Sequence, residues 1–503
     1  MMPMALPGLV LGLGYIMFFN KPWIEIPFLN IAVENSFSGL YGTFAIMIFC
    51  TVIHLFSVTY VTASTALKKL DREYENVAES MSVPFWKVFT KVSLPMCINA
   101  ILEIFIYFFV NAMVTVSAVV FLYTAQSKPA SIAILNMDDN GDYAAAAALA
   151  VSSFAGCGVK VTKTEETSVA PDADTSAASD TKAEKATEGS ITVYTAFEDD
   201  QIDKYLASFK EKYPDIKVDV IRESTGTLIA KVIAEKDNPV ADVIWGTSAS
   251  VMLQLEPYGL IKGYKPEKAD ELDPKFYDSS SDEPLWTGCD VYETAFLVNT
   301  QVCEKAGVPV PTSFKDLLDP CYKGMIVMPD PTSSGTGMLS VNGILQIMGE
   351  DEGWEYMKEL NENIASYTTS GSKPAKMAAA GECGIGISFG YRCSTLLAEG
   401  NPVEVVFPSE GCGWDVEANC LIAKDEINPA AYTFLDWAIS DEAMAEYATE
   451  YPITGRGVIG EIPKGYSEKP LENLCDLDLA KAAKDRDAII EKFTPFLSGK
   501  QAQ

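Results

Sequence analysis

The sequence predicts α-helical membrane segments followed by a two-lobed α/β domain, in a chain of 503 residues. Three observations lead to this prediction: long apolar runs in the first part, alternating strand-like and helix-like segments in the second, and a sharp change of charge between them. Residues 1–157 contain 7 Lys and Arg against 10 Asp and Glu, whereas the later residues hold most of the net charge of -31. Such an acidic region does not suit nucleic acid, which attracts basic surfaces.

Three long apolar runs lie in residues 1–142, at 4–20, 41–64 and 98–123. The second and third are long enough to cross a bilayer, since one crossing takes roughly 20 residues. The loop between them, residues 68–95, is rich in Lys and Arg, and we therefore expect it on the cytoplasmic side. The alternative is that the three runs form the buried core of a globular protein.

The loop reads LDREYENVAESMSVPFWKVFTKVSLP and predicts two helices, one over 75–81 and one that follows Pro84 and ends at Pro95. It resembles the coupling loop of ABC-transporter inner-membrane permeases, which docks onto the ATPase subunit. Ser82 departs from the family pattern, because glycine is usual at its position. The residues to which the resemblance assigns ATPase coupling are Glu75, Ala78, Leu94 and Pro95.

The resemblance to permeases covers about residues 3–150 and only the last half of the family's membrane domain. We therefore expect that this region forms no working channel alone. The partners that the resemblance implies are complete ABC permease subunits and a separate cytoplasmic ATPase.

Residues 143–157, YAAAAALAVSSFAGC, resemble the apolar region and lipobox of a bacterial lipoprotein signal. The resemblance implies that Cys157 carries the lipid; the alternative is a shortened last permease span. Residues 158–189 are rich in Thr, Ala, Ser and charge, and predict a disordered tether because they have few apolar side chains to bury. A lipid, a tether and a following domain are typical of a binding protein anchored outside the cell membrane.

The two resemblances conflict in membrane topology. If the loop at 68–95 is cytoplasmic, residues 124–142 lie outside, whereas a lipoprotein signal begins inside. We interpret the chain as a fusion of a truncated permease with the end of a lipoprotein signal, either natural or an artefact of sequence assembly. A non-functional gene fusion is the alternative to a working protein.

Residues 190–503 predict the two-lobed domain. Strand-like and helix-like segments alternate from 191 to 246, which indicates a parallel sheet covered by helices. A second such unit begins at Asn299, and the chain returns to the first lobe near 416–424. Ligands gather at the carboxyl ends of parallel strands, so we expect a cleft between two facing lobes.

The stretch PDPTSSGTGMLS at 329–340 stands at the start of a predicted helix. Hydroxyl groups and free backbone N–H groups at a helix N-terminus suit an anion. The alternative is a loop followed by an ordinary Ser/Thr helix cap.

Several segments carry a closer resemblance, among them STGTLIAKVIAEKDNPVADVIWG, SSGTG, YTTSGSKPAKMAAAGE and GISFGYR. They resemble the substrate-binding proteins of 2-aminoethylphosphonate ABC transporters, which are type II periplasmic binding proteins. The resemblance implies a clamshell that captures a small zwitterionic phosphonate and delivers it to the permease. It implies no enzymatic reaction and no cofactor.

A phosphonate oxyanion needs several donors, each charge-assisted bond contributing about 1.5–3 kcal/mol. The candidate donors are Ser333, Ser334, Gly335, Thr336, Ser224, Thr225, Ser370, Tyr391 and Arg392.

The ammonium group needs carboxylates or aromatic faces. The candidates are Glu198 and Asp290, with Trp245 and Tyr292 as aromatic walls. In the structural alternatives, Glu198 starts a helix, Trp245 belongs to the core and Arg392 pairs with an acidic neighbour.

Two related classes of binding protein are alternatives to a phosphonate binder. Ferric-iron binders use adjacent tyrosines, but here Tyr391 is followed by the cationic Arg392, and the only histidine is His54. Thiamine or polyamine binders favour an acidic, aromatic cleft without hydroxyl-glycine clusters. The lack of a histidine beyond His54 also removes Ser–His–Asp and Cys–His catalysis from the domain. Eight of the 11 cysteines follow Cys157, and the sequence leaves open whether they form disulfides or remain free thiols.

Overall fold

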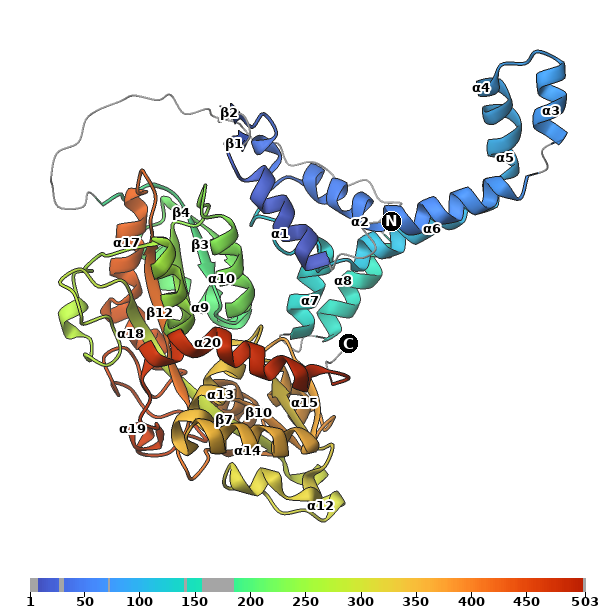
Figure 1. Cartoon of the computed structure of the whole chain (residues 1–503). Coiled ribbons are helices and arrows are strands. Elements are labelled where there is room, and N and C mark those ends of the chain that lie inside the picture. Colours follow the sequence, from blue (N-terminus) through green and yellow to red (C-terminus); the bar gives the residue numbers. More distant parts are fainter. Residues whose placement is uncertain (1–7, 27–30, 71–72, 140–142, 156–184, 501–503) are drawn as a thin grey trace. The chain divides into compact units, whose positions relative to one another are not determined.

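The computed structural model describes residues 8–26, 31–70, 73–139, 143–155 and 185–500. It forms two compact units, which are described separately. The first unit contains residues 1–135 and 144–154, and the second contains residues 136–143 and 155–503. Figure 1 shows the helical character of the first unit and the mixed sheet and helices of the second.

The first unit is built mainly of helices with one short hairpin. Its elements are α1 (Gly8–Phe19), β1 (Trp23–Ile26), β2 (Ile31–Glu34), α2 (Phe44–Lys68), α3 (Glu73–Ser80), α4 (Phe85–Val88), a π-helical turn (Phe89–Ser93), α5 (Leu94–Met96), α6 (Ile98–Val114) and α8 (Tyr143–Ala155); α7 (Ala130–Asp139) lies at the boundary between the units. Among the described residues, α2 is the one helix long and apolar enough to cross a membrane. The helical run 85–96 and the helix from Ile98 pass the same test only as a pair bent by 73°.

The third predicted span is corrected. The apolar run continues to Tyr123, but α6 ends at Val114, and residues 118–123 turn away and are buried. They pack against α1, where a side chain at Gly12 would come within 2.8 Å of the carbonyl oxygen of Ala118. The apolar character of residues 118–123 is therefore explained by their packing within the first unit, and these residues do not extend α6 across a membrane.

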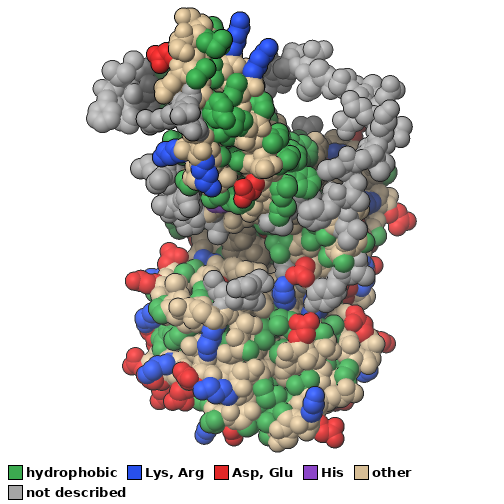
Figure 2. Space-filling view, turned by 90° about the vertical axis from the view of Figure 1, so that its right-hand side faces the viewer, with side chains coloured by type: hydrophobic (Ala, Val, Ile, Leu, Met, Phe, Trp, Pro, Cys, Tyr) green, Lys and Arg blue, Asp and Glu red, His purple; other side chains and the backbone are tan. Residues whose placement is uncertain are grey.

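Large apolar side chains stay exposed on the first unit, as Figure 2 shows for one face, whereas acidic and basic side chains are spread over the second unit. The exposed apolar residues include Met17, Phe44, Ile48, Phe56 and Phe105. A contiguous apolar surface of this kind suits lipid or other membrane helices.

The loop at 68–95 contains both predicted helices, α3 and the run from Phe85. The second predicted helix ends one residue beyond Pro95, at Met96, and the chain bends by 73° before α6 begins at Ile98. The π-helical turn just before it changes the hydrogen-bond pattern where Pro95 has no N–H to give. Ser82 has a φ of 54°, a conformation that costs a non-glycine residue about 1–2 kcal/mol. The serine therefore adopts the backbone for which the permease pattern uses glycine.

The second unit contains a sheet in the order β4-β3-β5-β12-β7-β10-β8-β9, with β6 beside β12 and β11 beside β7. The strands are β3 (Gly189–Thr195), β4 (Ile216–Arg222), β5 (Val243–Ser248), β6 (Ile261–Lys262), β7 (Thr287–Asn299), β8 (Ile326–Pro329), β9 (Ile364–Thr368), β10 (Ile385–Phe389), β11 (Val403–Val406) and β12 (Trp414–Ile422). β3, β4 and β5 are parallel and form the first lobe, and β8, β9 and β10 are parallel and form the second. The antiparallel strands β7 and β12 join the two lobes, so the predicted fold class is confirmed.

Helices cover both lobes. They are α9 (Asp199–Lys212), α10 (Thr225–Ala234), α11 (Ala249–Met252), α12 (Thr300–Ala306), α13 (Gly335–Met348), α14 (Glu350–Asn363), α15 (Lys373–Ala379), α16 (Gly390–Ala398), α17 (Pro429–Ala438), α18 (Asp441–Tyr447), α19 (Pro470–Asn473) and α20 (Leu479–Phe493). The C-terminal α20 contacts α11 of the first lobe and inserts Ile489 and Phe493 into the core of the second.

The described end of the predicted tether is ordered. Ala186 donates its N–H to the carbonyl of Pro429 and accepts a hydrogen bond from the Thr433 hydroxyl. The ordered domain therefore begins before Ser190, since these bonds fix the chain against α17. Residues 158–184 and Cys157 lie outside the described residues. All ten described cysteines are free thiols.

We expect Gly343→Ala to lower the free energy of unfolding of the second unit by about 1–3 kcal/mol, because overpacking of a tight core costs that much. The added methyl group would lie 2.4 Å from the Cα of Gly413, where α13 packs backbone to backbone against the start of β12. Chemical denaturation of the full-length chain in detergent measures the change. Gly353→Ala is the matched control, because its nearest neighbour is the movable end of the Leu345 side chain. Equal stabilities of the two variants would contradict the proposed contact.

Candidate functional site

The two lobes meet at the glycine-rich segments that the sequence singled out. The N–H of Gly226, in the first lobe, donates to the carbonyl of Ser333 in the second at 3.1 Å. A methyl group at Gly335 would lie 2.9 Å from the Thr225 hydroxyl and 3.1 Å from the Tyr292 hydroxyl. Glycine is therefore required here for close approach of the lobes.

A hydroxyl cluster, defined by Ser334, Thr336, Ser370 and Ser372, lines the second lobe at this place. The Oγ atoms of Ser370 and Ser372 are 3.1 Å apart, and Gly371 packs against the hydroxyls of Thr336 and Ser334. Ser334 is the N-cap of α13, and its Oγ accepts the N–H of Gly337 at 3.3 Å. The helix-cap alternative thus holds for Ser334, while the buried first turn of α13 still directs N–H groups and the positive end of the helix dipole toward this cluster.

A cation cluster, defined by Arg222, Lys376 and Arg392, surrounds Glu198. The Glu198 Oε2 lies 3.4 Å from the Arg222 Nη2, 3.7 Å from the Arg392 Nη2 and 4.0 Å from the Lys376 Nζ. All four side chains are less than 10% exposed. Arg222 belongs to the first lobe and the other two cations belong to the second, so closure of the lobes assembles the cluster.

Glu198 also connects the two clusters, because its carboxylate bonds to the Ser372 hydroxyl. Burial opposes ionisation of Glu198, but the three cations outweigh that effect and hold its pKa below the usual value. Burial is also the main influence on Lys376, whose pKa falls to about 8 although Glu198 acts in the opposite direction. Arg392 forms two further bonds, both of 3.1 Å, to the carboxylate of Asp200 across the lobes.

An acidic pair, Asp290 and Glu417, lies where β7 and β12 run side by side. The two residues are directly opposite in the strand register. Asp290 is fully buried, no N–H or O–H group of another described residue donates to its oxygens, and its carboxyl contacts that of Glu417. Burial raises the pKa of Asp290 well above its usual range and that of Glu417 to about 8.

Most predicted site residues lie in this region. Ser224 is the N-cap of α10, and Tyr391 stacks on Tyr451 with ring centroids 5.2 Å apart. Ser333 bonds to the carbonyls of Asp330 and Thr369. The contact region between the lobes also contains Ser334, Gly335, Thr336, Thr225, Asp290, Tyr292, Ser370 and Arg392.

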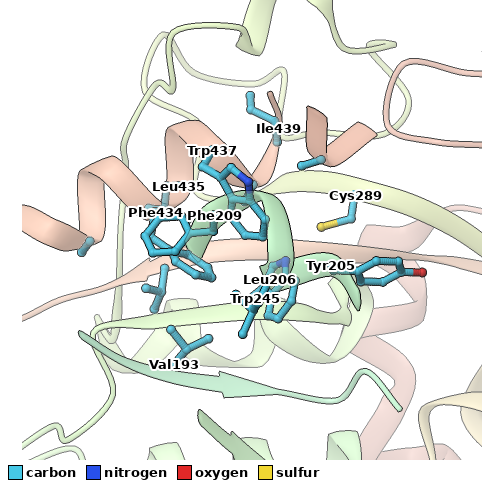
Figure 3. Packing of buried hydrophobic residues seen from close by; sticks show 14 of the residues in the cluster. Val193, Tyr205, Leu206, Phe209, Trp245, Cys289, Phe434, Leu435, Trp437 and Ile439 are labelled. Atoms are coloured by element: carbon cyan, nitrogen blue, oxygen red, sulfur yellow. The ribbon is translucent and has the colours of Figure 1, made fainter. Parts of the chain in front are cut away.

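Two predicted roles are corrected. Trp245 is no aromatic wall of the cleft: it is fully buried in the core of the first lobe, where it packs against Phe434 and Trp437 (Figure 3). Glu198 is surrounded by cations and begins α9, so it serves as a buried counterion and not as an ammonium ligand.

Sequence reasoning missed four residues: Arg222, Lys376, Ser372 and Glu417. A signal existed for Arg222, which directly follows the strand-like segment KVDVI, and for Lys376 and Ser372, which belong to the SGSKPAKMAAAGE segment. Glu417 had no signal, because only the pairing of β7 with β12 brings it beside Asp290. Within the described parts of the chain, no group of three or more His, Cys, Asp or Glu side chains is arranged to hold a metal ion.

The fold and cleft define a solute-binding protein, and comparison with known proteins agrees. Residues 238–465 match the family described as bacterial extracellular solute-binding protein. An uncharacterised protein of Haemophilus influenzae is 32% identical over 313 residues, which are 61% of this chain and 90% of that protein. The chain belongs to the bacterial extracellular solute-binding protein family.

Solved structures share the fold. The periplasmic binding protein AfuA of Actinobacillus pleuropneumoniae, solved with fructose-6-phosphate bound, is 30% identical, with a TM-score of 0.56 over 61% of this chain and 98% of AfuA. Iron-bound HitA of Pseudomonas aeruginosa has a TM-score of 0.52 over 60% of this chain and 98% of HitA, at 19% identity, which shows the fold alone.

Residues 1–159 match the family described as binding-protein-dependent transport system inner membrane component. The ferric transport system permease protein FbpB of Actinobacillus pleuropneumoniae is 31% identical over 148 residues, which are 29% of this chain but only 20% of FbpB. The chain thus combines a permease-like region with an extracytoplasmic solute-binding domain of the ABC importer superfamily, in a membrane-associated protein.

We expect the buried Lys376 to make stability depend on pH. Its pKa of about 8 in the folded chain lies below the ordinary 10.5, so between these values the unfolded chain binds more protons than the folded chain. The free energy of unfolding should therefore rise with pH across this window. Chemical denaturation at several pH values should show the rise in the native chain and a smaller rise in Lys376→Met. Lys358→Met, which changes an exposed lysine on α14, is the control, and an unchanged pH dependence in Lys376→Met would contradict the assignment.

Proposed function

We propose that the solute-binding domain captures 2-aminoethylphosphonate between its lobes and delivers it to an ABC permease. The observation that carries the proposal is the convergence of buried cations between the lobes. Arg222, Lys376 and Arg392 all lie within 4.0 Å of the buried Glu198 carboxylate, and Arg392 also pairs with the half-exposed Asp200. A phosphonate anion would bind beside these cations.

The hydroxyl cluster supports the same ligand. It lies next to the cation cluster through the bond between Ser372 and Glu198 and offers neutral donors to phosphonate oxygens. The acidic pair, at the strands that join the lobes, supplies carboxyl oxygens for the ammonium group. A short zwitterion therefore finds opposite charges on two sides of one cleft.

Closure follows from the positions of these groups. The ligand would contact Arg222 in the first lobe and Lys376 and Arg392 in the second, and would therefore favour the closed arrangement. The direct contact of Arg392 with Asp200 and of Gly226 with Ser333 holds the same arrangement. We propose binding and release without chemical change of the ligand, so the domain is not an enzyme.

A phosphorylated sugar is the second candidate. It is favoured by AfuA, which is 30% identical and was solved with fructose-6-phosphate bound. Its phosphate group would use the same cations, and its hydroxyl groups would bond to the acidic pair. Iron is disfavoured, because three buried cations would repel Fe³⁺.

The ligand assignment predicts the result of a thermal-unfolding titration of the full-length chain. Ligand at about 100 times its Kd should stabilise the domain by about 2.7 kcal/mol. We expect this with 2-aminoethylphosphonate, and not with putrescine or Fe³⁺. The effect should be lost in the double variant Ser334→Ala and Thr336→Ala and kept in Ser280→Ala, which changes an exposed loop hydroxyl.

The other outcomes separate the candidates. Stabilisation by fructose 6-phosphate at lower concentration than by 2-aminoethylphosphonate would establish the second candidate. Stabilisation by Fe³⁺ would overturn the argument from charge, and so would full binding of 2-aminoethylphosphonate by Arg222→Met.

We further propose that Cys157 carries a lipid and that Glu75, Ala78, Leu94 and Pro95 contact a cytoplasmic ATPase. Exposed Phe85 and Trp86 in the same loop support docking, because large apolar side chains in water favour a partner surface. The permease-like fragment would need complete permease subunits for transport. A fusion without transport activity stays the alternative.

The lipid proposal predicts that cells fed an alkyne-labelled fatty acid will label the native chain. Cys157→Ala should abolish that label, since the thiol is the site of attachment, whereas Cys321→Ala, which removes an exposed cysteine of the solute-binding domain, should keep it. In-gel detection of the alkyne measures both. Equal labelling of the native chain and Cys157→Ala would rule out the lipobox.

A further inference from the structure

The acidic pair has a feature that capture of a zwitterion alone does not require: its two carboxyl groups contact each other. Asp290 and Glu417 face each other on neighbouring antiparallel strands, where opposite side chains lie about 4.5–5.5 Å apart at their Cβ atoms. Asp290 is 0% exposed and Glu417 is 8% exposed. Two buried carboxylates in contact cannot both be ionised, so they share a proton.

The groups around the pair strengthen this conclusion. The carboxylates of Glu450, Glu198 and Glu293 face it from the end of α18, the start of α9 and β7. The phenols of Tyr205 and Tyr451 also face it, and Tyr451 bonds to Glu417.

No described Lys or Arg forms an ion pair with either member of the acidic pair. The nearby Glu450 differs, because its charge is met by Lys204 at 2.8 Å and by the amide of Gln201 at 2.9 Å. Among the described residues the acidic pair, like the neighbouring buried Glu293, therefore forms no ion pair with a cationic side chain of the protein.

We propose that the acidic pair holds one shared proton in the empty cleft and exchanges it for the cationic group of the ligand. This inference rests on the proposed function and adds to it a mechanism of selection. The pair with its proton carries a charge of -1, and the doubly ionised pair with one ammonium also carries -1. The exchange thus leaves the buried charge unchanged, and the proton goes to solvent.

The exchange distinguishes an ammonium from a hydroxyl group. A hydroxyl brings no charge, so it leaves the proton on the pair and only adds hydrogen bonds. An amine-bearing ligand should therefore release about one proton that an amine-free ligand does not. Glu417, which no sequence pattern indicated, becomes a specificity-determining residue of the cleft.

The conditions of the test follow from the two titrating parts of the cleft. Near neutral pH the pair retains its proton, because burial raises the pKa of Glu417 to about 8 and that of Asp290 well above its usual range. Lys376, with a pKa of about 8, is then mostly charged and takes up little further proton when an anion binds. Neutral pH therefore isolates the contribution of the acidic pair.

The experiment is isothermal titration calorimetry of the full-length chain in detergent, in two buffers of different ionisation enthalpy. The difference in heat gives the number of protons released. Each phosphonate also loses its own remaining proton when it binds as a dianion, and a pH titration of each free ligand in the same buffer gives that number. After this number is subtracted, we expect about one more proton with 2-aminoethylphosphonate than with ethylphosphonate, which lacks the amine. The double variant Asp290→Asn and Glu417→Gln has no carboxyl group of the acidic pair left to hold a proton and should lose that extra release, and Glu352→Gln on the exposed face of α14 should behave as the native chain does.

The possible results distinguish a failure of the proton exchange from a failure of the proposed function. Equal proton release with the two ligands, with binding of 2-aminoethylphosphonate intact, would overturn the exchange but not the proposed function. The comparison of two ligands on the native chain needs no variant, so a misfolded double variant would not prevent this decision. Binding of fructose 6-phosphate but not of 2-aminoethylphosphonate would overturn both.

Discussion

The cleft depends on one constraint: two long strands, β7 and β12, join both lobes while every residue in them is buried. Their backbone hydrogen bonds pair them with each other and with strands of both lobes, which fixes the base of the cleft. Polar side chains on such strands cannot reach water, and each must find a partner in the protein or in a ligand. This requirement applies at the point where the lobes meet to three polar side chains of these strands: Asp290, Glu417 and Tyr292.

The charges above this base illustrate how a protein keeps ions away from water. Glu198 would be costly to bury alone, but its three cationic neighbours make its ionised form the stable one. The same neighbours repel each other, and burial lowers the pKa of Lys376. The anionic ligand that we propose would relieve that repulsion. Closure of the lobes then strengthens each interaction by excluding water.

The permease-like region shows a local conflict of the opposite kind. Ser82 adopts a backbone conformation that favours glycine, and Pro95 continues a helix that it would ordinarily end. The π-helical turn before Pro95 absorbs the second conflict. Ser82 lies just after α3 in an exposed loop, and the described residues around it show no similar change of helix type. The loop therefore keeps the family's shape with one strained residue.

The sequence by itself determined the fold class and the two facing lobes, because strand and helix periodicities are local properties. The strands β3, β4 and β5 alternate with the helices α9 and α10 over the stretch where the sequence predicts such alternation. The hydroxyl-glycine segments could also be recognised from the sequence, because glycine at a close contact and serine at a helix start are local requirements. Charge and composition further excluded nucleic acid as a partner.

Only the tertiary structure decided which charges meet. Three cations converge on one carboxylate oxygen of Glu198, although they are far from it in the sequence: Arg222, Lys376 and Arg392. No spacing in the sequence indicates this convergence. Trp245 lies within β5, three residues before the end of the strand, and its side chain points into the core; strand position alone does not give that direction. The acidic pair likewise exists only through the register of β7 and β12. Burial and long-range pairing set the chemistry of this site, and both arise when distant segments pack together.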